Sequence, residues 1–315
     1  MMRYVLVYFF DAQGKNYYFR APLRFVFQKE KYTPYTELSL TVQDTARKLK
    51  PDMLLNRVQL SAESCLLHDG IIDRLEFCQQ NGVSVITVHS RGFTSLLLNN
   101  EMTPGIHTGM SLDKLMTEYY TFPQQIRWVP DSDTSNYIYV KPHRSMWDSV
   151  VNLAYKLYKT HPYIRRTNQI CLQAHEDAQS HLFTPDEILS TGSRMVGSRM
   201  LSHLHMQDVE GNYNAYQLEN PHAAQLYIVR HKQLAFDRQY LHDPEQSLNL
   251  TFALSAQGWR SRFVTCTGYR PLDVNDYVGA EGVFEPARIS AVTVTGDASG
   301  LKSTYTVYQD AFSEA

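Results

Sequence analysis

From Glu37 to Gln43 the sequence reads ELSLTVQ, in which polar and apolar residues alternate without a break. A period of two is the pattern of a β-strand with one face buried and the other in water. Short runs of strand type, separated by polar turns, occupy much of the first 90 residues: Tyr4–Phe10, Tyr17–Arg20, Arg24–Gln28, Leu55–Ser61, Gly70–Gln79 and Val83–Val88. So many short strands in so little chain predict a small β-barrel or sandwich.

The strand pattern returns near the other end of the chain. The residues Asp297-Ala298-Ser299-Gly300 are typical of a hairpin turn between two strands. We predict strands in this half at Ala224–Val229, Phe263–Gly268, Asp276–Gly279, Arg288–Gly296 and Ser303–Tyr308.

The residues between these two strand-rich regions favour helices. Apolar residues spaced by three and four predict a helix from Ser145 to Lys159, with Trp147 on its apolar face. Ser111 has the side chain of an N-cap for a second helix that reaches Tyr120. The short apolar run Phe93–Asn99 is also of helical type.

The second half contains one further predicted helix and one predicted loop. Asp243 as N-cap and Pro244 as first helical residue indicate a helix that extends to Arg262, with Trp259 among its apolar residues. Glycines and polar residues predict a long loop over residues 173–221.

The order of these elements predicts the fold class α+β, with two small β-barrel modules and helical or α/β insertions. We expect an N-terminal β-barrel module over residues 1–90 and a helical or α/β insertion over residues 91–172. The second β-barrel module is expected over residues 173–315, including the loop at 173–221 and the helix at 243–262.

Charge and hydrophobicity exclude some classes of partner. The 30 basic and 32 acidic residues give a formal net charge of −2, so no overall basic field attracts nucleic acid or an anionic membrane. No apolar run approaches the roughly 18 residues of a membrane span. Met1–Phe10 lacks a small-residue cleavage site, so we expect no signal peptide. We therefore expect neither sequence-specific nucleic-acid binding nor membrane insertion.

The cysteines and histidines do not form a recognisable metal motif. No CxxC pair occurs, and we expect four reduced and mostly buried thiols, at Cys65, Cys78, Cys171 and Cys266. His203 and His205 would share a face of an extended strand, but no further ligand stands nearby at a standard spacing, and the same holds for His175, Glu176, Asp177 and His181. We expect no metal site.

The segment Gly192–Arg199 superficially resembles a phosphate-binding loop. It lacks the GK[ST] ending and is not preceded by an apolar strand, so we interpret it as an ordinary loop and expect no cofactor.

Catalysis is the main alternative to a structural role. No G-x-S-x-G elbow is present, and we assign no catalytic residue. Glu101, Asp177 and Asp276 are conceivable acids of a glycoside hydrolase, which needs a carboxylate pair. Trp147 and Trp259 could stack on a carbohydrate, although a place in the core is the favoured reading for both.

Three stretches resemble the tail baseplate hub family of contractile-tailed phages and tailocins, which includes relatives of late-control protein D. The first is Gly70–Met102, where strands lead to Ser90-Arg91-Gly92 and then to Leu96-Leu97-Leu98. The second is Tyr137–Ile164, with a strand, a turn, Ser145-Met146-Trp147 and an amphipathic helix. The third is Arg270–Phe312, which begins RPLDV and closes on a strand. The segment from His175 to Gln217 has no counterpart in this resemblance.

The resemblance implies a structural role in a tail rather than an enzymatic one. It implies two related barrels per chain and a homotrimeric ring that adapts the tail tube to the central spike. The expected partners are further copies of the chain, the tail tube or tube-initiator protein, the spike protein and the tape measure protein. The expected location is the virion tail baseplate, assembled in the bacterial host cytoplasm. A tail-tip peptidoglycan hydrolase and a carbohydrate-binding adhesin remain the alternatives. The particle that contains the chain could be a phage, a tailocin or another injection system.

Overall fold

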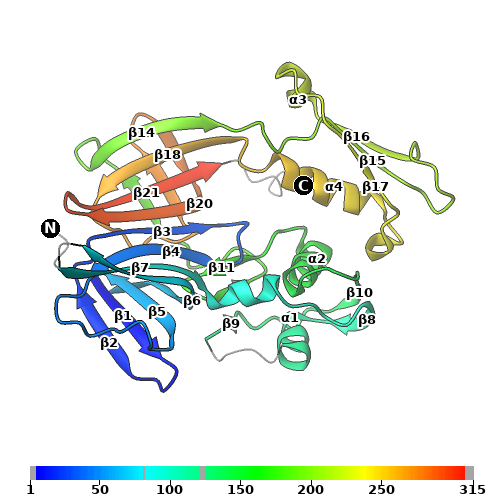
Figure 1. The fold of residues 1–315 in the computed structure, drawn as a ribbon. Coiled ribbons are helices and arrows are strands. Elements are labelled where there is room, and N and C mark those ends of the chain that lie inside the picture. Colours follow the sequence, from blue (N-terminus) through cyan, green and yellow to red (C-terminus); the bar gives the residue numbers. More distant parts are fainter. Residues whose placement is uncertain (1–4, 81, 121–124, 309–315) are drawn as a thin grey trace.

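The computed structural model describes residues 5–80, 82–120 and 125–308, and its largest feature is a mostly antiparallel sheet (Figure 1). Tyr4 lies outside these residues, and so does the end of Arg270–Phe312, the third stretch that resembles the hub family. The alternation read from ELSLTVQ is confirmed, because Leu38, Leu40 and Val42 are buried on one face of their strand. The first seven strands are β1 Val5–Asp11, β2 Asn16–Arg20, β3 Arg24–Glu30, β4 Thr36–Gln43, β5 Leu55–Ala62, β6 Cys65–Gln80 and β7 Val83–Gly92.

The strands from the C-terminal half join the same sheet. They are β13 Ser180–Phe183, β14 Ile188–Met195, β18 Arg260–Thr267, β19 Tyr277–Ala280, β20 Phe284–Asp297 and β21 Gly300–Tyr308. Asp297 pairs with Gly300, which confirms the predicted hairpin.

One pairing joins the two halves of the chain, and we call it the seam. Strands β3 and β20 are antiparallel neighbours, with Gln28 opposite Thr293 and Phe27 opposite Val294. The 13-stranded sheet runs β14-β18-β21-β20-β3-β4-β7-β6-β5-β1-β2, with β19 and β13 attached beside β20. Among the described residues no closed barrel is detected, and the strands of the two expected β-barrel modules form one continuous sheet. The reason is that β3 and β20 pair with each other across the two halves.

The register gives the two faces of the sheet opposite characters. One row of direct cross-strand partners runs Thr265, Thr304, Thr293, Gln28 and Glu37 across the seam. Cross-strand partners share a face, so this row is polar from end to end. Eight threonines lie on this hydroxyl-rich face, at positions 41, 87, 265, 267, 293, 295, 304 and 306. The opposite face carries the main core, which includes Phe27, Val294 and Tyr305.

Residues 93–172 form a second unit with a core of its own, which we call the insert. Ser111 accepts a hydrogen bond from the Lys114 backbone, as its predicted N-cap role requires. Ser145 and Asp148 form a capping box that opens the predicted long helix. The elements of the insert are η1 Phe93–Leu98, β8 Gly105–Met110, α1 Leu112–Lys114, η2 Leu115–Tyr119, β9 Arg127–Trp128, β10 Ser135–Val140, α2 Met146–Tyr158, β11 Tyr163–Arg165 and β12 Gln169–Cys171.

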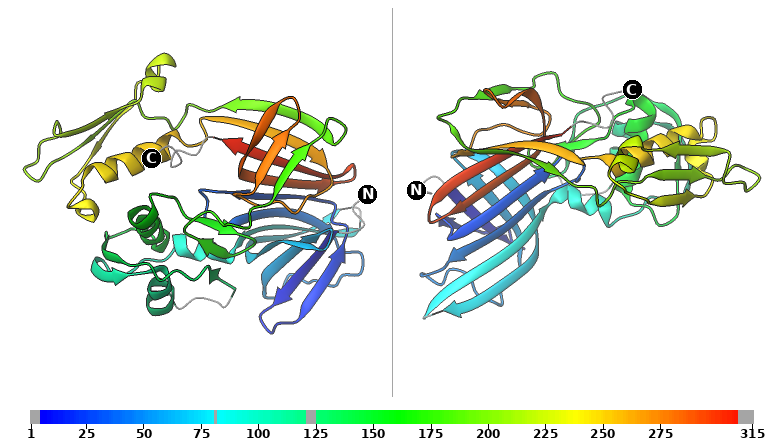
Figure 2. Two further views of the ribbon diagram at one scale, coloured as in Figure 1. Left: turned by 180° about the vertical axis from the view of Figure 1, so that it is seen from behind. Right: turned by 90° about the horizontal axis from the view of Figure 1, so that it is seen from above.

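Residues 200–256 form a third unit, which we call the arm. Figures 1 and 2 show the arm and the insert at one end of the molecule, away from the β1–β2 hairpin. The arm consists of β15 His203–Met206, β16 Tyr216–Glu219, α3 Pro221–Gln225, β17 His231–Leu234, η3 Arg238–Tyr240 and α4 Glu245–Ala256. None of the helices in the described part of the chain has the length and hydrophobicity that a membrane crossing requires.

The arm and the strands before it correct three predictions. The expected loop at 173–221 contains strands β13 to β16. The longest of them, β14, is polar and largely exposed, and the other three have four residues each, too few to establish an alternation. The predicted strand Ala224–Val229 begins inside helix α3, because Asn220 caps that helix and Pro221 opens it. Pro244 rather than Asp243 stands at the N-cap of α4, and this helix ends at Ala256, before Gly258 adopts a φ of +67°.

A histidine lies in the core on the side of the sheet opposite the hydroxyl-rich face. His68 on β6 is fully buried, with one ring nitrogen 2.9 Å from Thr36 Oγ1 and the other 2.8 Å from Ser90 Oγ. Burial lowers the pKa of His68 from its ordinary 6.5 to about 3. The folded protein therefore holds a neutral imidazole at a pH where the unfolded chain binds a proton.

This difference predicts a loss of stability in mild acid. Because the folded pKa lies below the unfolded one, stability is lost as the pH falls below 6.5 and continues to fall toward pH 3. Between pH 7 and pH 5, His68 contributes about 2 kcal/mol to that loss. Urea unfolding at both pH values measures it. His68→Gln should reduce the loss of unfolding free energy between pH 7 and pH 5 by this amount. His89→Gln, at an exposed histidine of β7, should leave that loss unchanged. Equal slopes in all three proteins would contradict the assignment.

Candidate functional site

Two polar sites join elements that are distant in sequence, and the first lies beside the seam. Lys29 of β3 is buried; its ammonium donates to the Arg166 carbonyl at 2.6 Å and pairs with Asp273. Burial lowers the pKa of Lys29, and the nearby Asp273 opposes that shift. The second oxygen of Asp273 accepts the Arg166 backbone N–H at 2.6 Å. This pair therefore ties the seam to the end of the insert.

The same site brings together two residues that the sequence had left apart. The His175 ring nitrogen Nε2 lies 3.0 Å from Asp276 Oδ1, and its Nδ1 lies 2.7 Å from the Tyr163 hydroxyl. Burial raises the pKa of Tyr163 well above its ordinary value. Asp276 also accepts backbone N–H groups from Gln179 at 2.9 Å and from Asp273 at 2.7 Å. With both oxygens engaged, this carboxylate is held in a structural network.

The other conceivable acids differ in position: Asp177 lines the same hollow as Asp276, whereas Glu101 lies in the insert. Asp177 is exposed and pairs with Arg165 at 2.8 Å, and this cation holds the pKa of the Asp177 carboxyl below its usual range. Glu101 is exposed and belongs to an isolated bridge opposite Ser145. Asp177 and Asp276 therefore share one hollow but are held by different partners, and Glu101 does not line that hollow.

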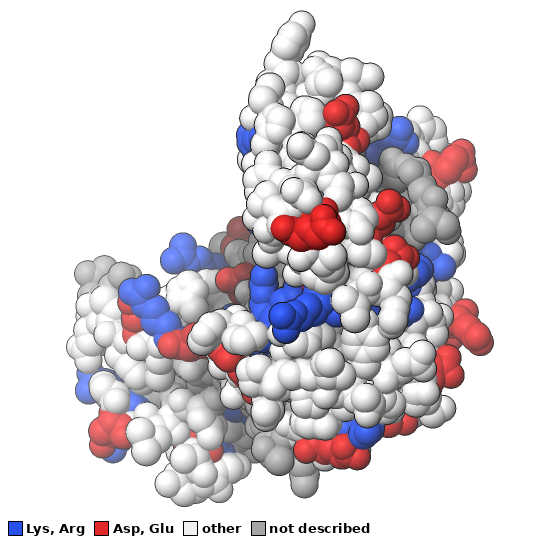
Figure 3. Space-filling view, turned by 90° about the vertical axis from the view of Figure 1, so that its right-hand side faces the viewer, with Lys and Arg blue, Asp and Glu red and all other residues white. Residues whose placement is uncertain are grey.

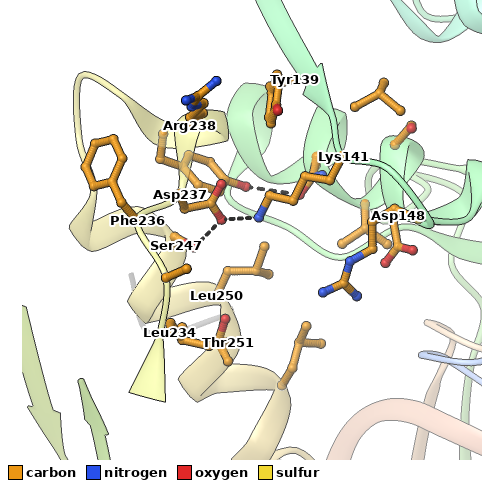
Figure 4. Close-up of a pocket in the computed structure, with 18 of the residues that line it drawn as sticks. Tyr139, Lys141, Asp148, Leu234, Phe236, Asp237, Arg238, Ser247, Leu250 and Thr251 are labelled. Atoms are coloured by element: carbon orange, nitrogen blue, oxygen red, sulfur yellow. Dashed lines mark hydrogen bonds and ion pairs between the residues drawn. The ribbon is translucent and has the colours of Figure 1, made fainter. Parts of the chain in front are cut away.

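The second polar site is a cleft between the insert and the arm, with a volume of about 790 Å³ (Figure 4). Lys141, which follows β10, reaches Asp237 at 2.6 Å. Asp237 also accepts from the hydroxyl of Ser247 on α4 at 2.6 Å and from the Gln239 backbone at 2.9 Å. The buried Asp237 thus fastens the arm to the insert, and Leu250 of α4 belongs to the core of the insert.

Cations dominate the remaining charge of this cleft. Arg144, Arg199, Lys232 and Arg238 line it and are exposed. In the described part of the chain none of the four forms an ion pair. Figure 3, which views the molecule from the right-hand side of Figure 1, shows lysine and arginine side chains gathered in the hollow beneath the projecting arm. The cleft therefore presents positive charge to solvent.

The arm also brings three histidines together. Parallel pairing of β15 with β17 places His231 opposite His203, and the two rings stack with centroids 4.2 Å apart. His205 lies on the same face, with its ring 5.8 Å from that of His231. His203 and His205 stood out in the sequence, whereas nothing in the local spacing pointed to His231. Among the described residues no group of side chains is arranged to hold a metal ion.

The remaining sequence candidates have structural places. Trp147 is buried in the core of the insert, as predicted. Trp259 lies beyond α4 and stacks on His222 with centroids 5.2 Å apart, so the prediction of a helical core residue is wrong. Gly192 lies in β14 directly over the Phe263 ring, where a Cβ would come within 2.6 Å, so the supposed loop begins as a strand.

The four cysteines are free thiols, and two of them are buried. Cys171 and Cys266 lie in the interior, and burial raises the pKa of each thiol to about 11. Cys65 is half-buried and Cys78 is exposed, so the expectation of mostly buried thiols holds for only half of them.

Comparison with solved structures identifies proteins of the same fold. A tail protein from Neisseria meningitidis MC58 superposes with a TM-score of 0.72 at 12% identity, covering 98% of this chain and 97% of that one. The 43 kDa tail protein of prophage MuSo2 from Shewanella oneidensis gives the same TM-score and identity, covering 98% and 99%. The E. coli c3393 protein, a component of the type VI secretion system, gives 0.55 at 10% identity, covering 92% and 74%.

The chain therefore has the fold of phage tail proteins over nearly its whole length, and the resemblance read from the sequence is confirmed at the level of fold. No protein-family model and no curated protein matches it.

The Lys29–Asp273 pair gives a test of the seam. Lys29→Met removes the cation and leaves the Asp273 carboxylate without its counter-charge, and we expect this to lower the free energy of unfolding by about 3 kcal/mol. Urea denaturation measures the change. Lys302→Met, on the exposed face of β21, is the matched control and should stay within about 0.5 kcal/mol of the parent. Similar losses in the two variants would mean that the buried pair does not stabilise the seam.

Proposed function

We propose that this chain is a structural hub subunit of a phage-like contractile-tail baseplate, that three copies form a ring, and that the ring adapts the tail tube to the central spike. The observation that carries the proposal is an open antiparallel sheet, in a fold that matches tail proteins over nearly the whole chain. An open sheet ends in strands that have unpaired backbone groups, and association with further copies satisfies such edges.

Exposed apolar side chains on the end strands support contact between copies. Leu189 and Met195 on β14, at one end of the sheet, are 50% and 56% exposed. Tyr18 on β2, at the other end, is 49% exposed. The two ends are different surfaces, so a contact between them is heterologous and generates a ring when its rotation closes.

The hydroxyl-rich face suits the wall of a central channel. Its threonines are neutral and its charged residues are of both signs, such as Glu37 opposite Arg91. Arg91 is itself paired with Asp73 at 2.7 Å. Such a surface gives a passing nucleic acid few free cations to bind, because it is cationic contacts that hold a phosphate backbone.

The role we propose is non-enzymatic: the chain contributes its shape and its contact surfaces to the assembly. Asp276 accepts two backbone N–H groups and Asp177 pairs with Arg165, and these engaged carboxylates favour a structural role over a tail-tip peptidoglycan hydrolase. The proposed partners are the tail tube or tube-initiator protein, the spike and the tape measure protein. The proposed location is the virion tail baseplate, with assembly in the host cytoplasm. We retain the division at residues 90 and 172 as a proposal for how the chain is organised, without closed barrels.

Oligomeric mass tests this proposal. In mass photometry we expect a particle of three chains, each of 36.4 kDa. Leu189→Lys with Met195→Lys places charge on the end strand β14 and should shift the protein to monomer, because lysine on an edge strand opposes pairing. Leu54→Lys, at an apolar loop residue that is 76% exposed, should leave the mass unchanged. A parent protein that stays monomeric at every concentration and is absent from purified tails would overturn the proposal.

A further inference from the structure

The cleft between the insert and the arm continues into a second hollow of about 940 Å³. The two share Tyr139, Ala235, Phe236 and Arg238 along their walls. We call the combined space the groove. Ordinary ligand pockets of proteins measure about 300–1,000 Å³, so the groove is larger than a compact small molecule needs. Its form suits a length of polypeptide.

The outer end of the groove is largely apolar, although Asp208 and Glu210 of the β15–β16 turn also line it. Ile106 on β8 is 68% exposed, Val209 in the β15–β16 turn is 76% exposed, and Leu241 after η3 is 52% exposed. These three come from both walls, because Ile106 belongs to the insert and the other two belong to the arm. Isolated exposed apolar residues are ordinary, but three that line one hollow mark a surface to be covered.

The inner end of the groove is cationic. Its two carboxylates, Asp148 and Asp237, are engaged by the Ser145 hydroxyl at 2.7 Å and by Lys141 at 2.6 Å. Four cations remain that form no ion pair with a carboxylate of the described residues: Arg144, Arg199, Lys232 and Arg238. Four exposed cations around one hollow leave a charge that an anionic occupant would neutralise, and arginine suits bidentate recognition of carboxylates.

We propose that the groove binds an acidic segment of a partner tail protein, with its carboxylates on the inner cations and an apolar anchor at Ile106, Val209 and Leu241. This inference rests on the proposed structural role, because it names the chemistry of one contact that such a subunit makes. The charge complementarity and the apolar end together select the occupant. A nucleic acid would use the cations but leave the apolar end uncovered, and the chain's net charge of −2 provides no wider basic field to hold it.

Binding of defined probes tests the groove. The main probe is a fluorescent peptide with glutamates in its first half and leucines and serines in its second. A hexaglutamate peptide and a short oligo-dT serve for comparison. Fluorescence anisotropy with the full chain should show that the mixed peptide binds more tightly than either, and that its binding weakens as salt rises.

Two variants separate the ends of the groove. Arg144→Glu with Arg238→Glu should weaken both peptides by about tenfold or more, because two attractive contacts become repulsive. Ile106→Ser should weaken the mixed peptide and leave hexaglutamate unchanged. Arg47→Glu with Lys50→Glu, which makes the same charge change at exposed positions of the β4–β5 loop, is the matched control and should bind both peptides like the parent.

Four results would overturn the inference: no binding of the mixed peptide at low salt, equal binding by the cleft variant and the control, tighter binding of oligo-dT than of the mixed peptide, or dissociation of the oligomer by the cleft variant. The last would assign the groove to a second copy of the chain. If the parent protein is trimeric but does not bind the mixed peptide, the groove proposal is wrong and the ring proposal still stands.

Discussion

The structure depends on the seam, where β3 near the N-terminus pairs with β20 near the C-terminus. Six residue pairs connect these strands, and through them every other strand of the large sheet is joined to its distant half. Closing a loop of this length costs conformational entropy before any contact forms, so the seam needs strong local support. It has that support on its buried face, where Phe27 lies opposite Val294 and Lys29 holds Asp273.

Helix α4 plays the equivalent part for the arm. Leu248 and Phe252 pack with the apolar side of the arm sheet, whereas Leu250 and Leu254 pack with the insert. A helix with two apolar sides lacks a single hydrophobic stripe, and it is held because it lies between two cores. Asp237, fastened to Lys141 and Ser247, then sets the width of the cleft beside it.

The polar groups of this protein are mostly occupied, and that bears on its function. Two of the carboxylates considered for catalysis, Asp177 and Asp276, form an ion pair or accept hydrogen bonds. Hydroxyls of the large sheet also bond to one another, as Thr265 and Thr304 do at 2.9 Å. The exposed apolar side chains and unpaired cations on which the proposals rest lie on the end strands of the sheet and on the walls of the groove. This distribution supports the proposed role in assembly.

The sequence by itself determined the local elements. Alternation located the strands of the first 90 residues, and Ser145 located the start of α2, because these signals act within a few residues. It also gave a fold resemblance that the solved tail proteins confirm. Only the tertiary structure decided the single open sheet in place of two closed barrels, the union of His175 with Asp276, and the meeting of Lys141 with Asp237. Each joins segments about a hundred residues apart or more. A contact of this kind produces no periodic pattern in the sequence of either segment, so the sequence does not reveal it. Strand β14 of the large sheet and strand β17 of the arm escaped detection for a related reason, since both are largely exposed and so have no apolar alternation to display.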